Sequence, residues 1–170
     1  DLHVQIFGKD HPNVAFPQNE LAVLLHKLGD YLPAKKLYEE AFRIRKEALG
    51  EHHLRTSETA ANLAHLALNQ GDILAAQKGF KAALEMALGV GDSAAKRIPI
   101  YQANLGFALR RSGSFEEAIA ILREALDMAK KNLGPHHTST ALVQAQMAGA
   151  LADSGKLDEA LIIQKEAVKT

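Results

Sequence analysis

Histidine is the residue type whose spacing in this chain first suggests chemistry. Two adjacent pairs, His52-His53 and His136-His137, lie in similar short segments, and His11 precedes His53 by a repeat period of about 42 residues. Imidazole nitrogens bind metals and transfer protons near neutral pH. A metal site, however, needs three or four converging ligands, and residues repeated at long regular intervals do not converge. We therefore expect these histidines to shape connectors and to cap helices, and we expect no metal.

Other arrangements that support catalysis are missing from the sequence. It has no Gly-rich loop ending in Lys-Ser/Thr, no dinucleotide fingerprint, no zincin His-Glu pair, no EF-hand loop and no nucleophile elbow. Cysteine is absent, which excludes thiol nucleophiles and thiolate metal sites. We expect a protein that is not an enzyme and that needs no cofactor.

Carboxamide side chains recur with the same period, at Asn62, Asn104 and Gln146. An amide both donates hydrogen bonds to and accepts them from a peptide backbone, so it can hold an extended peptide with little dependence on the ligand's sequence. Glu20 interrupts the series at its first position. The alternative is that these amides are solvated or bridge neighbouring helices.

Arg110 and Arg111 supply a local positive charge, although 20 basic and 20 acidic residues leave the chain neutral overall. A guanidinium group can pair with both oxygens of a carboxylate. Lys27 and His65 would add to this basic character, and Phe107 offers an apolar contact. These residues predict a ligand segment that carries Asp, Glu or a terminal carboxylate. The alternative is that the two arginines form an ordinary solvated helix end.

Glycine marks the elements that must position these side chains. Apolar residues at three- and four-residue steps precede and follow each turn glycine, which predicts two amphipathic helices around it. Glycine suits the left-handed conformation that ends a helix. Small residues, including Gly106, recur where two helices must approach closely. The four turn glycines, each one repeat period from the next, are Gly29, Gly71, Gly113 and Gly155.

Polar and proline residues predict where these helices begin. Asp30, Asp72 and Ser114 follow the turn glycines and are expected to cap the second helices. Pro99 predicts an altered or kinked start of its first helix. Pro17 predicts that the first helix of the chain begins late.

The repeated pattern resembles the tetratricopeptide repeat. It has a leucine followed by a small residue in the first helix, a turn glycine with a large apolar residue, and two alanines in the second helix. The spacing and connectors such as Leu49-Gly50-Glu51-His52-His53 are similar to those of the kinesin light chain subtype. The resemblance implies an all-α fold, a right-handed α-solenoid of about four antiparallel helix pairs. We expect one continuous array with repeats at residues 7–48, 49–90, 91–132 and 133–170, the last truncated, and residues 1–6 ending a preceding repeat helix.

A peptide-binding groove on the first helices follows from the same resemblance, since these helices line the concave surface of such arrays. Periodicity directs Leu21, Ala22 and Leu25 toward the partner helix and places polar residues beside them. The predicted groove residues are Asn19, Lys27, Asn62, His65, Asn69, Asn104, Phe107, Arg110, Arg111 and Gln146.

These features predict a scaffold that binds a peptide or a short helix of another protein, with acidic segments favoured. The alternative is an oligomerisation or regulatory module of a larger protein that self-associates through the apolar ends of the array. RNA binding has thin support, because it needs a strongly positive groove with stacking aromatic residues. The residues that motivate end-to-end association are Leu2, Val4, Ile6, Ile162, Ile163 and Val168.

Composition limits the location and the remaining partners. A neutral chain gives no general attraction to nucleic acid or to an anionic membrane surface. No apolar run approaches the roughly 20 residues that a membrane helix requires. A sequence without cysteine fits a reducing compartment. We expect a cytoplasmic protein with no nucleic-acid or membrane partner.

Overall fold

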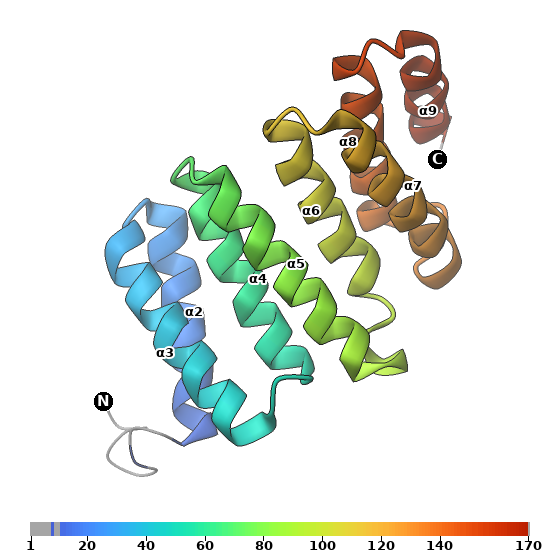
Figure 1. Ribbon diagram of the computed structural model, residues 1–170. Helices are drawn as coiled ribbons and strands as arrows, with labels where there is room; N and C mark the ends of the chain where they lie inside the picture. Colours follow the sequence, from blue (N-terminus) through green and yellow to red (C-terminus); the bar gives the residue numbers. More distant parts are fainter. Residues whose placement is uncertain (1–7, 9–10, 170) are drawn as a thin grey trace. The chain divides into compact units, whose positions relative to one another are not determined.

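The computed structural model describes residue 8 and residues 11–169, and this part of the chain is helical without any strand. Within the described residues, eight α-helices follow one another as sequential antiparallel pairs (Figure 1). This confirms the prediction of an all-α chain of about four helix pairs. Residues 1–6, which were predicted to end a preceding helix, lie outside the described residues. The pairs are α2 (Pro12–Leu28) with α3 (Tyr31–Leu49), α4 (Leu54–Asn69) with α5 (Ile73–Val90), α6 (Ile98–Arg111) with α7 (Phe115–Asn132), and α8 (Thr138–Asp153) with α9 (Leu157–Lys169).

The helices form two compact units. Unit 1 covers residues 1–90 and contains α2 to α5, and unit 2 covers residues 91–170 and contains α6 to α9. A short 3-10 helix, η1 (Asp92–Ala94), precedes α6 in unit 2. None of the helices described for residues 11–169 is both long enough and apolar enough to cross a membrane.

Each pair turns at one of the predicted glycines. The φ angles of Gly29, Gly71, Gly113 and Gly155 lie between 82° and 85°. A residue with a Cβ atom is strained at such positive angles, so glycine at these positions allows the first helix to end and the chain to reverse. The predicted role of the repeated glycines is confirmed.

Histidine caps the first helix in three of the four pairs. The Nδ1 atom of His11, His53 and His137 accepts a hydrogen bond from the backbone N–H two residues later, at 3.1, 3.2 and 3.1 Å respectively. Each bond satisfies one of the N–H groups that the first helical turn leaves without an intrahelical partner. The predicted capping role of the connector histidines is therefore confirmed.

Caps of the second helices follow the prediction at one position only. Asp72 Oδ1 accepts a hydrogen bond from the backbone N–H of Ala75 at 3.0 Å. Asp30 and Ser114 make no side-chain capping bond. The glycine turn already orders the backbone in all four pairs, so a pair can form without this cap.

The two prolines behave differently. Helix α6 begins only at Ile98, with Pro99 in its first turn, as the sequence predicted. Helix α2 begins at Pro12 and continues through Pro17, so the predicted late start is wrong. Pro12 lies in the first turn, where a missing N–H costs nothing, and Pro17 removes at most one backbone hydrogen bond of α2.

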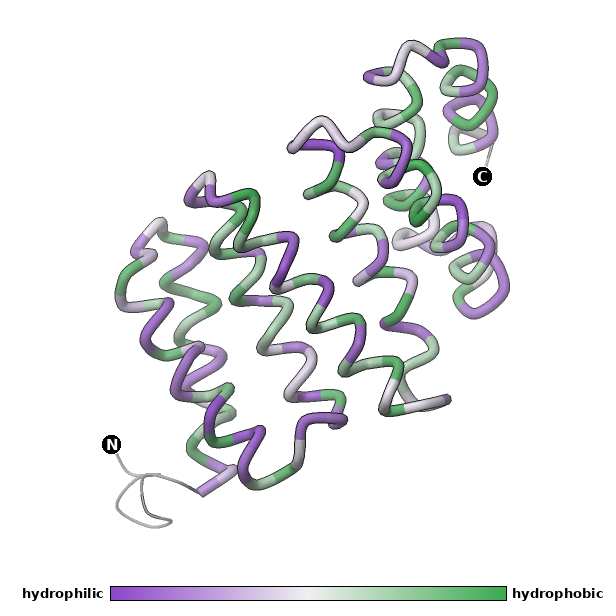
Figure 2. The backbone as a smooth tube through the Cα atoms, viewed as in Figure 1, coloured by the Kyte–Doolittle hydropathy of each residue, from purple (hydrophilic) through white to green (hydrophobic). Residues whose placement is uncertain are grey.

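Small residues bring the helices of each unit close together. In unit 1, Ala22, Ala34, Tyr38 and Leu66 form a buried cluster from α2, α3 and α4. In unit 2, a Cβ atom added to Gly106 would lie 2.5 Å from Leu122 Cγ, so only glycine fits between α6 and α7. Figure 2 shows the alternation of apolar and polar residues along the helices that produces these packed faces.

Candidate functional site

The first helices of unit 1, α2 and α4, are joined side by side by polar side chains. Asn62 Nδ2 donates a hydrogen bond to Asn19 Oδ1 at 3.4 Å, and the amide of Asn69 lies 2.8 Å from His26 Nε2. Both pairs join residues 43 positions apart, one more than the repeat period of 42 residues, so the two contacts have the same offset between neighbouring first helices. The predicted groove residues Asn19, Asn62 and Asn69 thus lie along α2 and α4 together with His26, and Asn19 is buried among them.

A pocket of about 380 Å³ opens on this face. It contains the predicted residues Lys27, Asn62, His65 and Asn69, and it also contains residues from α3, which the analysis of first helices alone did not include. The turn aromatic Tyr31 was visible in the repeat pattern, but its contribution to this surface was missed. The full lining is Val23, His26, Lys27, Tyr31, Tyr38, Asn62, His65 and Asn69.

Burial keeps most of this pocket uncharged at neutral pH. It lowers the pKa of His26, and it lowers the pKa of His65 with a further contribution from the nearby His26. Burial, with a smaller contribution from Glu20, raises the pKa of Tyr38 to about 12. Lys27, which is exposed, therefore supplies the positive charge in the pocket lining.

Aromatic contacts fix the two imidazole rings. The His65 ring meets Phe80 of α5 edge-on, with 4.7 Å between the ring centroids, and the His26 ring meets Tyr31 edge-on at 5.9 Å. Such edge-to-face geometry is favourable for aromatic pairs. His65, which was predicted in the groove, and His26 are thus both held by packing against aromatic rings.

A buried arginine supports the same face from behind. Arg45 on α3 is only 4% exposed, and its Nη1 atom donates to Thr59 Oγ1 at 2.6 Å and to the Arg55 carbonyl oxygen at 3.0 Å. Thr59 Oγ1 in turn lies 3.4 Å from Asn19 Oδ1. This network reaches Asn62 through Asn19. Repeat periodicity does not reveal this network, because the positions equivalent to Arg45 in the next two repeats hold Ala87 and Ala129.

Unit 2 separates the two predicted arginines. Arg110 Nε on α6 donates to Asp153 Oδ2 on α8 at 2.5 Å. A Cβ atom at Gly149 would collide with the Arg110 guanidinium, so Gly149 leaves room for it. Arg111 is exposed, and its side chain has no ion pair among the residues that the structure describes. Arg110 is therefore already paired, whereas Arg111 can meet a ligand.

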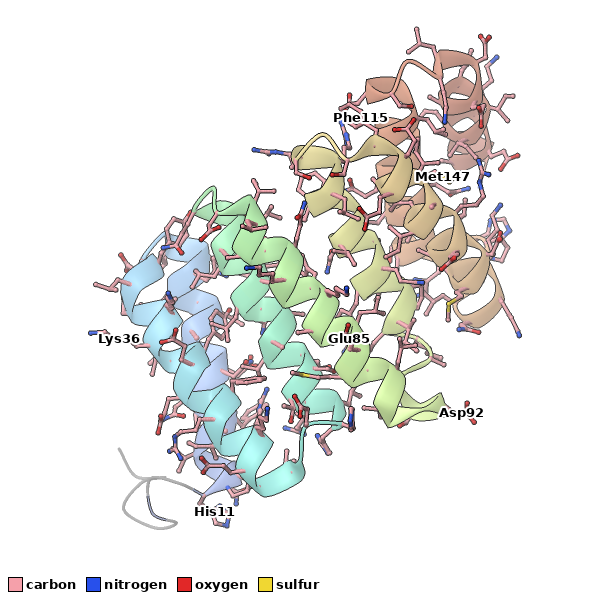
Figure 3. All side chains as sticks on the ribbon, viewed as in Figure 1. His11, Lys36, Glu85, Asp92, Phe115 and Met147 are labelled. Carbon is pink, nitrogen blue, oxygen red and sulfur yellow. The ribbon has the colours of Figure 1, made fainter. Side chains whose placement is uncertain are left out.

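The remaining predicted residues lie on the first helices of unit 2. Asn104 and Phe107 on α6 and Gln146 on α8 are partly exposed. Second helices in both units carry solvated charges, such as Lys36 and Glu85 (Figure 3). Within residues 11–169, no group of three or more His, Asp or Glu side chains is placed to hold a metal ion.

Comparison with known sequences identifies the repeat. The family described as tetratricopeptide repeat matches residues 1–47, 14–89 and 98–170, which together cover most of the chain. No curated protein matches the chain.

Solved structures share the fold at low sequence identity. A point variant of the nearly identical TPR-like repeats assigned to a kinesin light chain of Podosopora anserina has a TM-score of 0.83 and 21% identity, over 99% of this chain and 79% of that chain. The same repeats without this variation have a TM-score of 0.80 and 21% identity, over 99% of this chain and 80% of that chain. BtubC from P. vanneervenii has a TM-score of 0.80 and 18% identity, over 93% of this chain and 63% of that chain. At these identities the likeness concerns the fold.

Proposed function

The chain belongs to the tetratricopeptide repeat family, whose repeats are generally non-catalytic modules for protein–protein interaction, and from that premise we propose that its first helices bind a peptide segment of a partner protein. The observation that supports this proposal most strongly is the pocket of about 380 Å³ on α2 and α4 of unit 1. Its lining combines amides, neutral imidazoles and one exposed lysine.

The amides of this pocket keep capacity for a ligand. An amide side chain has two N–H donors and an oxygen that accepts two hydrogen bonds. Asn62 and Asn69 each use one group in their bonds to Asn19 and His26. Their remaining donors and acceptors suit the N–H and C=O groups of an extended peptide backbone. Because those bonds also fix the amide orientation, the ligand would meet groups that are already positioned.

Charge favours an acidic ligand segment. Lys27 in unit 1 and Arg111 in unit 2 are exposed cations on first helices. Arg110 contributes less, because Asp153 already neutralises it. We propose that carboxylates of the ligand contact Lys27 or Arg111, with Phe107 adding an apolar contact in unit 2.

The test is a binding screen of the full chain against arrayed acidic, basic and neutral peptides, followed by calorimetric titration of the best acidic peptide. Asn62→Ala should weaken binding at least tenfold, about 1.4 kcal/mol. Gln164→Ala is the matched control, since Gln164 is an exposed amide on α9 outside the pocket. No saturable binding, or equal affinity in the native chain and the Asn62→Ala and Asn69→Ala variants, would overturn the proposal.

We also propose a cytoplasmic location and self-association of the chain. The cysteine-free sequence supports a cytoplasmic location. Self-association of the chain is favoured by a specific observation on α2, an exposed stripe of leucines.

A further inference from the structure

An apolar stripe runs along one face of α2. Leu21, Leu24 and Leu28 are 49%, 58% and 76% exposed, and Leu32 at the start of α3 extends the stripe with 68% exposure. Periodicity had directed Leu21 toward the partner helix, and the structure instead leaves half of it open. Large contiguous apolar patches on a protein surface usually mark an interaction site.

The positions equivalent to Leu24 are buried in the other repeats. Leu66, which stands one repeat after Leu24, packs in the cluster with Ala34 and Tyr38 and is 1% exposed. In unit 2, Met147 and Ala150 stand at the positions of Leu21 and Leu24, and both are buried. The middle of the stripe therefore has the composition of a surface that packs against another helix.

The stripe is longer than the contact between stacked repeats. Leu28 stands at the position of Gln70, Ser112 and Ser154, and none of these three residues is buried. Another repeat stacked on α2 would thus cover Leu21 and Leu24 but would leave Leu28 open. The full stripe fits a helix that lies beside the whole length of α2.

The spacing of the stripe matches a second copy of itself. Pro17, Leu21, Leu24 and Leu28 follow one another at steps of four, three and four residues, which is the spacing of a coiled-coil seam. When two such helices run antiparallel with Leu21 opposite Leu24 of the second copy, Leu28 lies opposite Pro17 of the second copy. Both ends of the seam are then covered at once.

Charge complementarity supports the same alignment. Glu20 and Lys27 flank the seam on the same side and are both exposed. In the antiparallel alignment, Glu20 of each copy lies near Lys27 of the other, so the contact forms twice around a twofold axis. We propose that this chain forms a symmetric dimer through the α2 stripe. This proposal does not require peptide binding, but the two contacts compete for Lys27, which also lines the pocket.

The first test measures the mass of the full chain by sedimentation equilibrium over a concentration series. The native chain of 18.4 kDa should approach twice that mass as its concentration rises. Leu24→Glu should weaken association at least tenfold. Leu74→Glu is the matched control, because Leu74 is a leucine of similar exposure, 62%, on α5 outside the stripe. The Leu74→Glu variant should associate like the native chain.

The second test exchanges the flanking charges and keeps the leucines. Glu20→Lys and Lys27→Glu should each weaken the dimer, and the double variant should restore it, because the pairs re-form with opposite polarity. Helical content by circular dichroism checks that each variant folds. A monomeric native chain at every concentration would overturn the proposal and leave the stripe to a helix of different sequence. Equal effects of Leu24→Glu and Leu74→Glu, or no recovery in the double charge variant, would also overturn it.

Discussion

Arg110 on α6 and Asp153 on α8 form an ion pair in the same repeat register as the hydrogen bond between His26 and Asn69 in unit 1. In both units, the last turn of one first helix is thus joined to the last turn of the next. Two arginines that are adjacent in sequence consequently have different roles, since only Arg110 takes part in this contact.

Replacing the two adjacent arginines should have different effects, one on peptide affinity and the other on the stability of the fold. Arg111→Ala should weaken an acidic peptide about tenfold, about 1.4 kcal/mol, without changing the melting temperature, because it removes an unpaired surface charge. Arg110→Ala should lower the free energy of unfolding by less than about 1 kcal/mol, since the pair with Asp153 is partly exposed to solvent. Calorimetric titration and thermal melts measure the two effects. Equal loss of affinity in both variants would contradict this division.

The histidine caps should contribute measurably to stability. His137→Ala removes the acceptor for the Ser139 N–H and should cost about 0.5–2 kcal/mol, whereas His137→Asn should restore most of this loss, because asparagine is a preferred capping residue. His136→Ala is the control, since His136 is exposed and makes no capping bond. Urea unfolding compares the variants. If His136→Ala destabilises the chain as much as His137→Ala, the capping role is wrong.

Acidification should destabilise unit 1. Burial, assisted by His26, holds the pKa of His65 below its ordinary value of 6.5 in the folded chain. Below pH 6.5 the unfolded chain therefore binds more protons than the folded chain. The free energy of unfolding should be at its full value above that pH and should fall as the pH drops toward the folded-state pKa.

His65→Leu tests this pH dependence. Its urea midpoint should fall less than that of the native chain between about pH 7.5 and pH 5. Proton NMR titration of the imidazole provides a direct check in the native chain. A His65 pKa at or above 6.5 would contradict the prediction.

The Arg45 network should show strong coupling. Thr59→Val removes the hydroxyl that accepts a 2.6 Å hydrogen bond from Arg45, and it should cost about 1–3 kcal/mol because a buried charge loses a partner. The double variant Arg45→Met/Thr59→Val should be more stable than Thr59→Val alone, since it removes the charge together with its partner. Apolar residues already occupy the equivalent positions of unit 2, Ala129 and Val143. A double-mutant cycle by urea unfolding measures the coupling, and additive effects would show that the two residues act independently.

Local rules made most of the fold predictable. The positive φ angle of Gly29, Gly71, Gly113 and Gly155 depends on the absence of a side chain at those positions. The helix period of apolar residues and the capping by His11, His53 and His137 likewise involve residues close together in sequence. Local rules failed at Pro17, because the rest of α2 tolerates the loss of one backbone hydrogen bond.

The candidate site was predictable only in part. Periodicity identified Lys27, Asn62, His65 and Asn69 as neighbours on one face, because residues in the same repeat register occupy equivalent places on successive helices. It could not identify Tyr38 as part of the pocket, since that side chain reaches the pocket from a second helix.

The sequence by itself determined the repeat, the helix pairs and the turns, since backbone conformation and amphipathic period are set within a few residues. Only the tertiary structure decided that Arg110 is paired, that Arg45 is buried and that the leucines of α2 are exposed. The first two outcomes depend on which side chains the neighbouring helix presents, and those residues are distant in sequence. The third depends on which described helices pack against that face of α2, and periodicity within one helix does not specify it.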